Sequence, residues 1–380
     1  MPTTFDLVVV GGGIVGCSAA AIAAERGASV ILVEAHAVGS GASGRNSGAV
    51  QHPFDPVLAE LHVETLAIYR ELAAVRPDFG FPGHPAGLLL LTDDEAGARS
   101  RADELAAAYP ALAPEVLDAD ELRRREPIIG PGLSALRLET GHPIPPDAAT
   151  AAMAARAAAA GAVLRVGDGA ASLVLAGDRV TGVRLASGRS VAGGAVLVAA
   201  GPWTPDLVDA SGAWRPLRPT YGVTVQVAMG RSARHVLEEG AVHTLNRPVD
   251  AVTGAELPST FSMVSVGEVS TVGSTFLPTA PNPDAVAPVL VSRGTRLVPA
   301  LAQATIVRAR VCTRPQSVDG RPFIGPLPGV SGLFTCVGHG PWGISTGPAS
   351  ARLVVDAILT GDEQHIAPEL RAARAAGPST

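Results

Sequence analysis

The hydrophobic pattern at the start of the chain predicts a strand, a helix and a second strand. Residues 7–10 form an uninterrupted apolar run, residues 14–26 are alanine-rich and close at Gly27, and residues 29–33 form a second apolar run that ends at Glu34. Short apolar runs bounded by Gly are typical of buried parallel strands, and a helix connects such strands. The first 34 residues are therefore predicted to form a βαβ unit.

The rest of the chain divides into helical and extended patterns. Helical spacing of apolar positions predicts helices over residues 56–74, 93–107, 118–125, 148–160, 284–301 and 345–360. Apolar runs and alternation predict strands over residues 87–91, 163–166, 179–185, 190–191, 195–201, 221–229 and 332–337. The apolar strands fall at the start, middle and end, and the alternating ones lie between them. This order predicts one discontinuous nucleotide-binding domain with an inserted sheet domain.

Composition places the chain among ordered globular proteins. Its 380 residues are 47% hydrophobic and 17% charged, with a net charge of −6, so nothing in the charge favours nucleic acid or an anionic membrane as a partner. The sequence contains no lysine, and all 29 basic residues other than histidine are arginine. A high-GC genome explains this bias, but it also removes lysine-based chemistry.

Targeting and crosslinking signals are not found in the sequence. The N-terminus runs directly into the first predicted strand without a secretory signal, and no apolar run reaches the length of a membrane span. Three cysteines do not form a disulfide framework. We therefore expect a soluble cytoplasmic protein. His142, His235 and His243 lack metal-ligand spacing, so no metal site is predicted.

Gly11, Gly13 and Gly16 follow the first strand, and Glu34 ends the second. Gly11 permits a tight turn, Gly13 lets backbone N–H groups approach a pyrophosphate, and Gly16 lets the helix pack closely on the strand. The helix N-terminus favours the negative charge of that pyrophosphate, and Glu34 can accept both ribose hydroxyls. This unit predicts a site for the ADP half of a dinucleotide, either NAD or FAD.

Three further segments carry polar or Gly-rich patterns. The Gly/Ser-rich residues 39–48 suit either a ligand along the top of the sheet or a surface loop. Residues 337–346 form a Gly-rich turn before the last helix, whose N-terminus can hold an electron-rich carbonyl. Between them, Arg314 could take a carboxylate with its planar fork, or simply lie on the surface.

In this order and spacing, the segments resemble the D-amino-acid oxidase, glycine oxidase and sarcosine oxidase superfamily of FAD enzymes. The similarity includes residues 11–34 and 43–48, the apolar strand and Ala-Ala-Gly of residues 195–203, and residues 314–325 and 338–345. It spans essentially the whole chain, although residues 86–144 and 216–309 match only in general layout.

The resemblance implies an α/β fold with a Rossmann-like FAD-binding domain of the glutathione-reductase type and an inserted, mainly antiparallel substrate domain. The implied FAD-binding domain comprises residues 1–85, 145–215 and 310–380, and the substrate domain comprises residues 86–144 and 216–309. The implied FAD contacts are Gly11, Gly13, Ile14, Val15 and Gly16 at the pyrophosphate, Glu34 and Ala170 at the adenosine, Gly201, and, around the isoalloxazine, Ser43, Arg45, Asn46, Ser47, Gly338, Gly340, Gly343, Ile344 and Ser345.

The resemblance also implies a reaction. Arg314 would hold the carboxylate of a small amine, such as glycine, sarcosine, a D-amino acid or a cyclic imino acid. Hydride transfer from the substrate carbon to flavin N5 would give an imine that hydrolyses. His339 and Tyr221 are expected near the substrate. Three alternatives stay open: a 2-hydroxy-acid dehydrogenase with a histidine base, a subunit of a heteromeric amino-acid dehydrogenase, and an enzyme that tailors a large natural product.

Two departures from the family pattern bear on the chemistry. Cys312 stands where sarcosine oxidases carry a cysteine bonded to the flavin 8α carbon, so it is a candidate for covalent attachment. Thr271 or Val272 stands where those oxidases place an oxygen-activating lysine. Either O2 or a quinone-like carrier is therefore expected as electron acceptor, with Arg45 or His52 as possible substitute cations.

Overall fold

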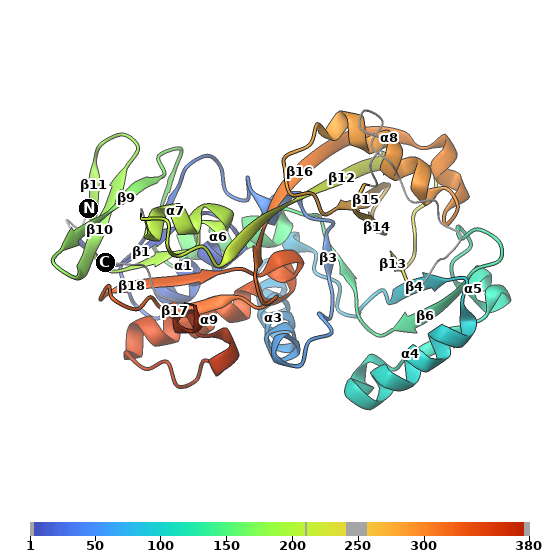
Figure 1. Ribbon diagram of the computed structural model, residues 1–380, viewed down its shortest axis with the longest axis horizontal. Coiled ribbons are helices and arrows are strands. Elements are labelled where there is room, and N and C mark those ends of the chain that lie inside the picture. The colour runs from blue at the N-terminus through green and yellow to red at the C-terminus, as the bar shows by residue number, and fades with distance from the viewer. Residues whose placement is uncertain (1–3, 210, 241–256, 376–380) are drawn as a thin grey trace.

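The computed structural model describes residues 4–209, 211–240 and 257–375. Two eight-stranded sheets lie side by side, with helices packed against each (Figure 1). The first sheet is mainly parallel and the second mainly antiparallel. The predicted α/β class is confirmed, with a Rossmann-like sheet and an antiparallel one.

The first sheet has the strand order β17-β18-β11-β1-β2-β8, and β10 and β9 extend from β11. Its strands are β1 (Thr4–Val10), β2 (Val30–Glu34), β8 (Val163–Val166), β9 (Ala170–Ala176), β10 (Arg179–Leu185), β11 (Ser190–Val198), β17 (Phe323–Pro326) and β18 (Leu333–Val337). The helices α1 (Ile14–Glu25), α3 (Pro56–Val75), α6 (Ala148–Ala159) and α9 (Gly343–Thr360) form a mutually packed layer. The two strands that were predicted over residues 190–191 and 195–201 are one strand in the structure, β11.

The second sheet has the order β16-β12-β15-β14-β13-β4-β6-β5, in which only β13 and β4 are parallel neighbours. Its strands are β4 (Leu88–Thr92), β5 (Glu115–Leu117), β6 (Ser134–Leu138), β12 (Leu217–Ala228), β13 (Val236–Glu239), β14 (Ser259–Val266), β15 (Val269–Thr275) and β16 (Thr305–Ser317). The helix α8 (Pro283–Gly294) packs on the face that carries Val223, Val225 and Val272. The opposite face turns toward the first sheet, because Thr224 Oγ1 donates to the carbonyl of Arg45.

Two sequence expectations differ from the structure in this region. The helix predicted over residues 284–301 ends at Gly294, and a 3₁₀ turn (Pro299–Gln303) follows it. The strand β16 was not predicted, although Val307, Ala309 and Val311 alternate with Arg308 and Arg310 in its sequence. The predicted domain boundary at residue 310 falls inside β16, which pairs with β12 along its length. The division into two domains otherwise stays a prediction.

The remaining elements are short or peripheral. The helices α4 (Glu95–Ala108) and α5 (Ala119–Arg125) flank the β5–β6 edge, and α7 (Thr204–Val208) follows β11. The strands β3 (Ala49–Val50) and β7 (His142–Pro143) form a separate two-stranded pair. Residues 42–45 of the Gly/Ser segment form the short helix α2 (Ala42–Arg45). This segment is therefore an ordered turn near the end of β1 rather than a loose surface loop.

Candidate active site

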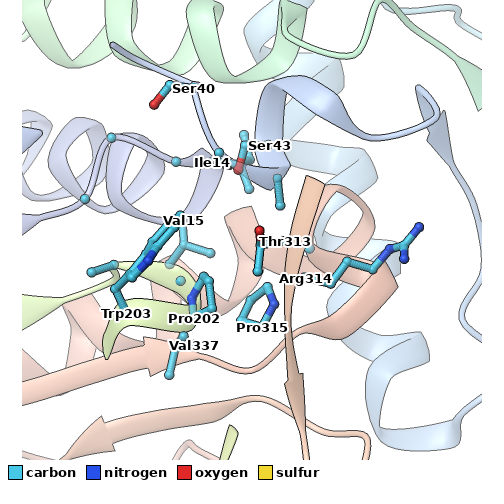
Figure 2. Close-up of a pocket in the computed structure, with 18 of the residues that line it drawn as sticks. Ile14, Val15, Ser40, Ser43, Pro202, Trp203, Thr313, Arg314, Pro315 and Val337 are labelled. Atoms are coloured by element: carbon cyan, nitrogen blue, oxygen red, sulfur yellow. Dashed lines mark hydrogen bonds between the residues drawn. The ribbon is translucent and has the colours of Figure 1, made fainter. Parts of the chain in front are cut away.

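An elongated cavity of about 660 Å³ lies where the carboxyl ends of the first sheet meet the second sheet. It is lined from several distant parts of the chain, as Figure 2 illustrates. Of the predicted site residues, the cavity wall includes Gly11, Gly13, Ile14, Val15, Glu34, Ser43, Arg45, Asn46, Ala170, Gly201, Cys312, Arg314, His339, Gly340, Gly343 and Ile344. The tertiary structure thus brings together segments that are up to about three hundred residues apart in sequence.

The turn between β1 and α1 forms one end of the cavity. Gly11 has a φ of 112°, and a Cβ on Gly16 would overlap the carbonyl oxygen of Gly11, so these positions require glycine. Gly13 is the N-cap of α1 without a side-chain cap. Gly13 itself makes no capping bond, so the first turn presents positive partial charge to the cavity together with the N–H groups that no side chain occupies.

Two side chains complete this end of the cavity. Ser43 Oγ accepts the N–H of Ile14 at 3.0 Å, which leaves the hydroxyl proton of Ser43 to donate elsewhere. Glu34 accepts the N–H of Gly12 at 2.7 Å and that of His36 at 2.8 Å. These two contacts fix the Glu34 carboxylate at the cavity wall with lone pairs remaining for a sugar hydroxyl.

The N-terminus of α9 forms another part of the cavity wall. The 3₁₀ turn Gly340–Trp342 leads into α9, and its N-cap residue Trp342 makes no side-chain capping bond. His339 precedes this turn, is 4% exposed, and its Nε2 has no hydrogen-bond partner among the described residues. Burial lowers the pKa of His339 to about 4, so the ring is neutral at physiological pH.

Strand β16 crosses the cavity and presents different residues to its two sides. Figure 2 shows Thr313 and Pro315 on the side of Val15 and Pro202, with Arg314 pointing to the opposite side. The Arg314 guanidinium donates to the carbonyl of Thr275 at 2.9 Å and to Ser274 Oγ. It lies 4.8 Å from the ring centroid of Phe276. A Cβ on Gly222 would overlap this guanidinium, so the glycine creates the space for it.

Cys312 and Arg310 lie on the same side of β16 as Arg314, because side chains alternate along a strand. Cys312 is a free thiol with 2% exposure at the cavity wall. Arg310 donates to the carbonyls of Gly44 and Asn46, both at 3.3 Å. Sequence reasoning missed Arg310, and the only available signal was its spacing of four residues from Arg314.

Several predicted residues lie near the cavity without lining it: Gly16, Ser47, Tyr221, Gly338 and Ser345. Gly16 acts in the packing of α1 on β1, and Ser345 Oγ accepts the N–H of Gln51 at 3.0 Å. Tyr221 lies on β12, and its backbone pairs with that of Thr313 on β16 and with that of Leu277. The lining residues Trp203, Thr313 and Pro315 were not predicted as site residues, although Trp203 ends the motif of residues 195–203.

The two positions considered for the missing lysine face opposite ways. Thr271 pairs with Gln226, on the sheet face that turns toward the first sheet, whereas Val272 lies in the core under α8. His52 is 6% exposed and packs against Phe54, His62 and Tyr109, outside the cavity wall.

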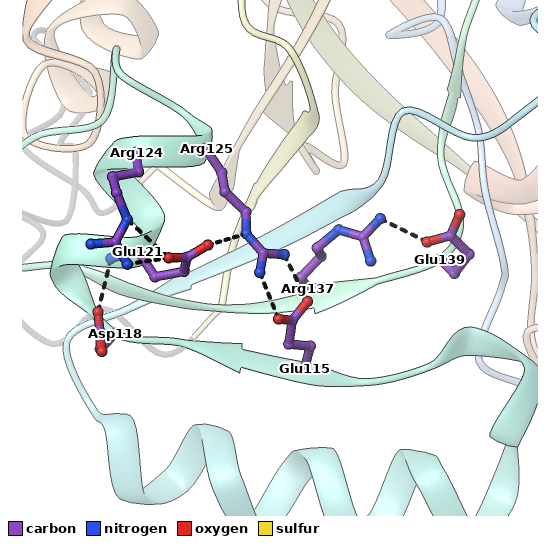
Figure 3. Close-up of polar contacts among 7 residues, drawn as sticks. All are labelled: Glu115, Asp118, Glu121, Arg124, Arg125, Arg137 and Glu139. Carbon is purple, nitrogen blue, oxygen red and sulfur yellow. Dashed lines mark hydrogen bonds and ion pairs between the residues drawn. The ribbon is translucent and has the colours of Figure 1, made fainter.

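A separate charged cluster lies outside the cavity wall, at the edge of the second sheet (Figure 3). Arg125 forms ion pairs with Glu115 and Glu121, and Arg137 pairs with Glu139. Because these side chains are partly or largely exposed, each pair contributes at most about 1 kcal/mol to stability. The charges satisfy one another, so the cluster offers no unpaired group for chemistry.

The match to a family model decides the class of the protein. The model for FAD dependent oxidoreductases, DAO, matches residues 6–357. The chain belongs to the DAO family of FAD-dependent oxidoreductases. The resemblance drawn from the sequence motifs is confirmed, as is the expectation of a flavin-dependent enzyme.

Individual DAO-family proteins align along nearly the whole chain. The glycine oxidase of Pseudomonas putida is 29% identical over 96% of this chain and 96% of its own. The hydrogen cyanide synthase subunit HcnC of Pseudomonas aeruginosa is 27% identical over 98% of this chain and 97% of its own. The crystal structure of a glycine oxidase from Bacillus cereus superimposes with a TM-score of 0.79 and 25% identity, covering 95% and 97% of the two chains.

The cavity of this DAO-family chain fits FAD. The side-chain-free cradle at residues 11–13 and the uncapped N-terminus of α1 suit a pyrophosphate. The fixed carboxylate of Glu34 suits the adenosine ribose, and the uncapped α9 suits a flavin carbonyl. Covalent attachment and the individual FAD contacts stay predictions.

Among the described residues, no group of three or more His, Cys, Asp or Glu side chains could hold a metal ion, and His243 lies outside that part of the chain. None of the helices that the structure describes has the length and apolar character needed to cross a membrane.

Burial of three histidines predicts acid destabilisation of this DAO-family protein. Burial lowers the pKa of His62, His142 and His339 to about 4 each. In the unfolded chain these rings titrate near 6.5, so the unfolded state binds more protons between about pH 6.5 and 4. We therefore expect full stability above pH 6.5 and a falling thermal midpoint as the pH drops toward 4.

Differential scanning fluorimetry of His142→Leu tests this prediction. Removing one of the three groups is expected to flatten the decline of the midpoint between pH 6.5 and 4. The exposed His365 provides the control, because His365→Leu is expected to leave the slope unchanged. An unaltered slope in His142→Leu would contradict the assignment.

Proposed function

We propose that this enzyme oxidises a small amine or amino acid that bears a carboxylate, and that Arg314 holds the carboxylate. The observation that supports this most is the position of Arg314 at the cavity wall, with its guanidinium over Gly222 and beside Ser274 and Thr275. A guanidinium has five N–H donors, and those two contacts use two of them. The remaining donors suit a bidentate carboxylate.

The chain's own residues then position the substrate rather than activate it chemically. Bound FAD supplies the two-electron acceptor. Arg314 orients the carboxylate, and the neutral amine of the substrate carries its own lone pair, so no protein base is required. Two of the similar proteins are named glycine oxidases, and oxidation of an amino acid agrees with this proposal.

Oxidation of a 2-hydroxy acid is the second candidate, because His339 has an unpartnered Nε2 at the cavity wall. Removing the proton of an alcohol needs a base, and a catalytic base works best with a pKa near the working pH. Burial lowers the pKa of His339 to about 4, which makes it a weak base. The amine reaction is therefore favoured.

An anaerobic screen tests the proposal. The purified holoenzyme is mixed with glycine, sarcosine, D- and L-amino acids, cyclic imino acids and 2-hydroxy acids, and the visible flavin absorbance is followed. Bleaching by an amine supports the proposal, whereas bleaching by a hydroxy acid alone overturns it. Admitting air or a soluble quinone to the bleached enzyme identifies the acceptor. If no compound bleaches the flavin and partner chains copurify, the heteromeric subunit alternative is favoured.

We also propose a thioether between Cys312 Sγ and the flavin 8α carbon. Its formation would remove the thiol proton and one 8α hydrogen, and the two electrons released would pass through the flavin to the enzyme's electron acceptor, O2 or a quinone-like carrier. Cys312 is a free thiol at the cavity wall, on the same side of β16 as Arg314. Acid precipitation is expected to leave the flavin in the protein pellet. The variant Cys312→Ala is expected to release flavin to the supernatant, while Cys336→Ala, which removes a buried thiol of the last strand, behaves as the parent. Flavin in the parent's supernatant would contradict the link.

A further inference from the structure

We propose that Glu238 forms a subsite for a positively charged or hydrogen-bond-donating group at the far end of the substrate. This inference rests on the proposed function, because it takes the substrate carboxylate to be held by Arg314. It assigns the substrate class more narrowly: carboxylates that carry an ammonium or amide several bonds away.

The contacts of Glu238 leave half of its carboxylate unused. Gln51 Nε2 donates to Glu238 Oε1 at 2.8 Å, and no partner for Oε2 is found in the described part of the chain. Burial raises the pKa of Glu238, with the bond from Gln51 acting in the opposite direction. A cationic group of a ligand would supply the positive partner that a buried carboxylate needs to stay ionised.

Strand register places Glu238 on the same sheet face as the arginines of β16. Pairs across the sheet link Arg310 to Thr224, Thr224 to Gly273, Gly273 to Ser262, and Ser262 to Glu238. Paired residues point to the same face of a sheet. The contact with Gln51 supports this assignment of the face. The backbone N–H of Gln51 donates to Ser345 at the start of α9, and its side chain donates to Glu238, so Glu238 faces the layer that contains α9.

The distance between the two charged ends suits a small linear molecule. The Arg314 guanidinium reaches Ser274 and Thr275 at the end of β15. Glu238 lies on β13, two strands further along the sheet. Neighbouring strands are about 4.8 Å apart, so the two groups are separated by roughly 10 Å across the strands. The α-amine of an amino acid is too close to its carboxylate to reach both ends.

The surface between the two groups is polar and partly open. Gly273 has no side chain, and Ser262 beside it is partly accessible and makes no side-chain hydrogen bond among the described residues. Glu238 is partly accessible, and it lies outside the lining of the 660 Å³ cavity that includes Arg314.

Ligand binding to the resting holoenzyme tests the subsite without turnover. The probes are matched pairs that lack an α-amine: butanoate with 4-aminobutanoate, pentanoate with 5-aminopentanoate, and hexanoate with 6-aminohexanoate. Each is titrated anaerobically while the flavin difference spectrum is recorded. At least one amino compound is expected to bind about tenfold more tightly than its partner, as expected for one desolvated charge pair.

Two variants decide whether Glu238 causes the preference. Glu238→Gln keeps the size of the side chain and is expected to reduce the ratio to within about twofold. Glu268→Gln removes the same charge from an exposed turn of the same sheet and is expected to retain the parent ratio. Equal binding within every pair, or a preference that survives Glu238→Gln, would overturn the subsite.

The test also separates failure of the subsite from failure of the proposed function. Arg314→Ala is expected to weaken both members of each pair. If the unaminated carboxylates bind and depend on Arg314 but show no amine preference, only the subsite is wrong. If no carboxylate binds, and no amine bleaches the flavin in the substrate screen, the proposed function fails and the subsite is overturned with it.

Discussion

Replacing Arg314 by alanine is expected to lower kcat/KM by about 10²- to 10⁴-fold while the enzyme keeps its FAD. A charge-assisted hydrogen bond contributes about 1.5–3 kcal/mol, and two such bonds to a carboxylate amount to roughly 3–6 kcal/mol. The guanidinium lies on the side of β16 opposite Val15 and Pro202 (Figure 2), so its loss leaves the nucleotide end of the cavity intact. Steady-state kinetics with the best amine, together with flavin content, measures both effects.

Further variants distinguish positioning of the guanidinium from its charge. Gly222→Ala keeps Arg314 but places a Cβ where the guanidinium lies, so KM is expected to rise with Arg314 still present. Arg308→Ala removes an exposed arginine of the same strand and serves as the charge-matched control. Loss of flavin in Arg314→Ala with unchanged substrate capture would reverse the assigned role.

Replacing Gly11 by alanine is expected to yield a chain that retains less than about a tenth of its FAD. The φ of 112° disfavours any side chain, and the added Cβ would overlap the carbonyl oxygen of Ala199. This oxygen belongs to the main chain just after β11, so relief requires the turn or the strand end to shift. Strain and overlap together cost about 3–6 kcal/mol, and the displaced turn is the one that cradles the pyrophosphate.

Gly27 provides the matched control for this substitution. It also has a left-handed φ, 88°, but no atom lies within 4 Å of an added Cβ. Gly27→Ala therefore introduces strain without overlap, and it is expected to cost about 1 kcal/mol and to retain FAD. Flavin absorbance after desalting and the thermal midpoint compare the two variants. Full flavin content in Gly11→Ala would contradict the role of the turn.

The comparison of expectation and structure shows which signals are local. The βαβ unit was predicted correctly because its requirements lie within 34 residues: apolar runs, helical spacing and glycines where a turn or a close approach excludes a side chain. The family resemblance was likewise carried by short motifs. By contrast, β16 was missed even though Val307, Ala309 and Val311 alternate with Arg308 and Arg310, which is the spacing of a strand.

The sequence by itself determined the cofactor class, the α/β fold and the importance of Arg314 as a candidate. Only the tertiary structure decided which side chains share a face. Thr271 turns toward the first sheet and Val272 into the core, and Glu238 lies on the face of Arg314 although 76 positions separate them. A shift of one residue in strand register reverses every such assignment. Register depends on pairing between distant strands, so no local pattern could supply it.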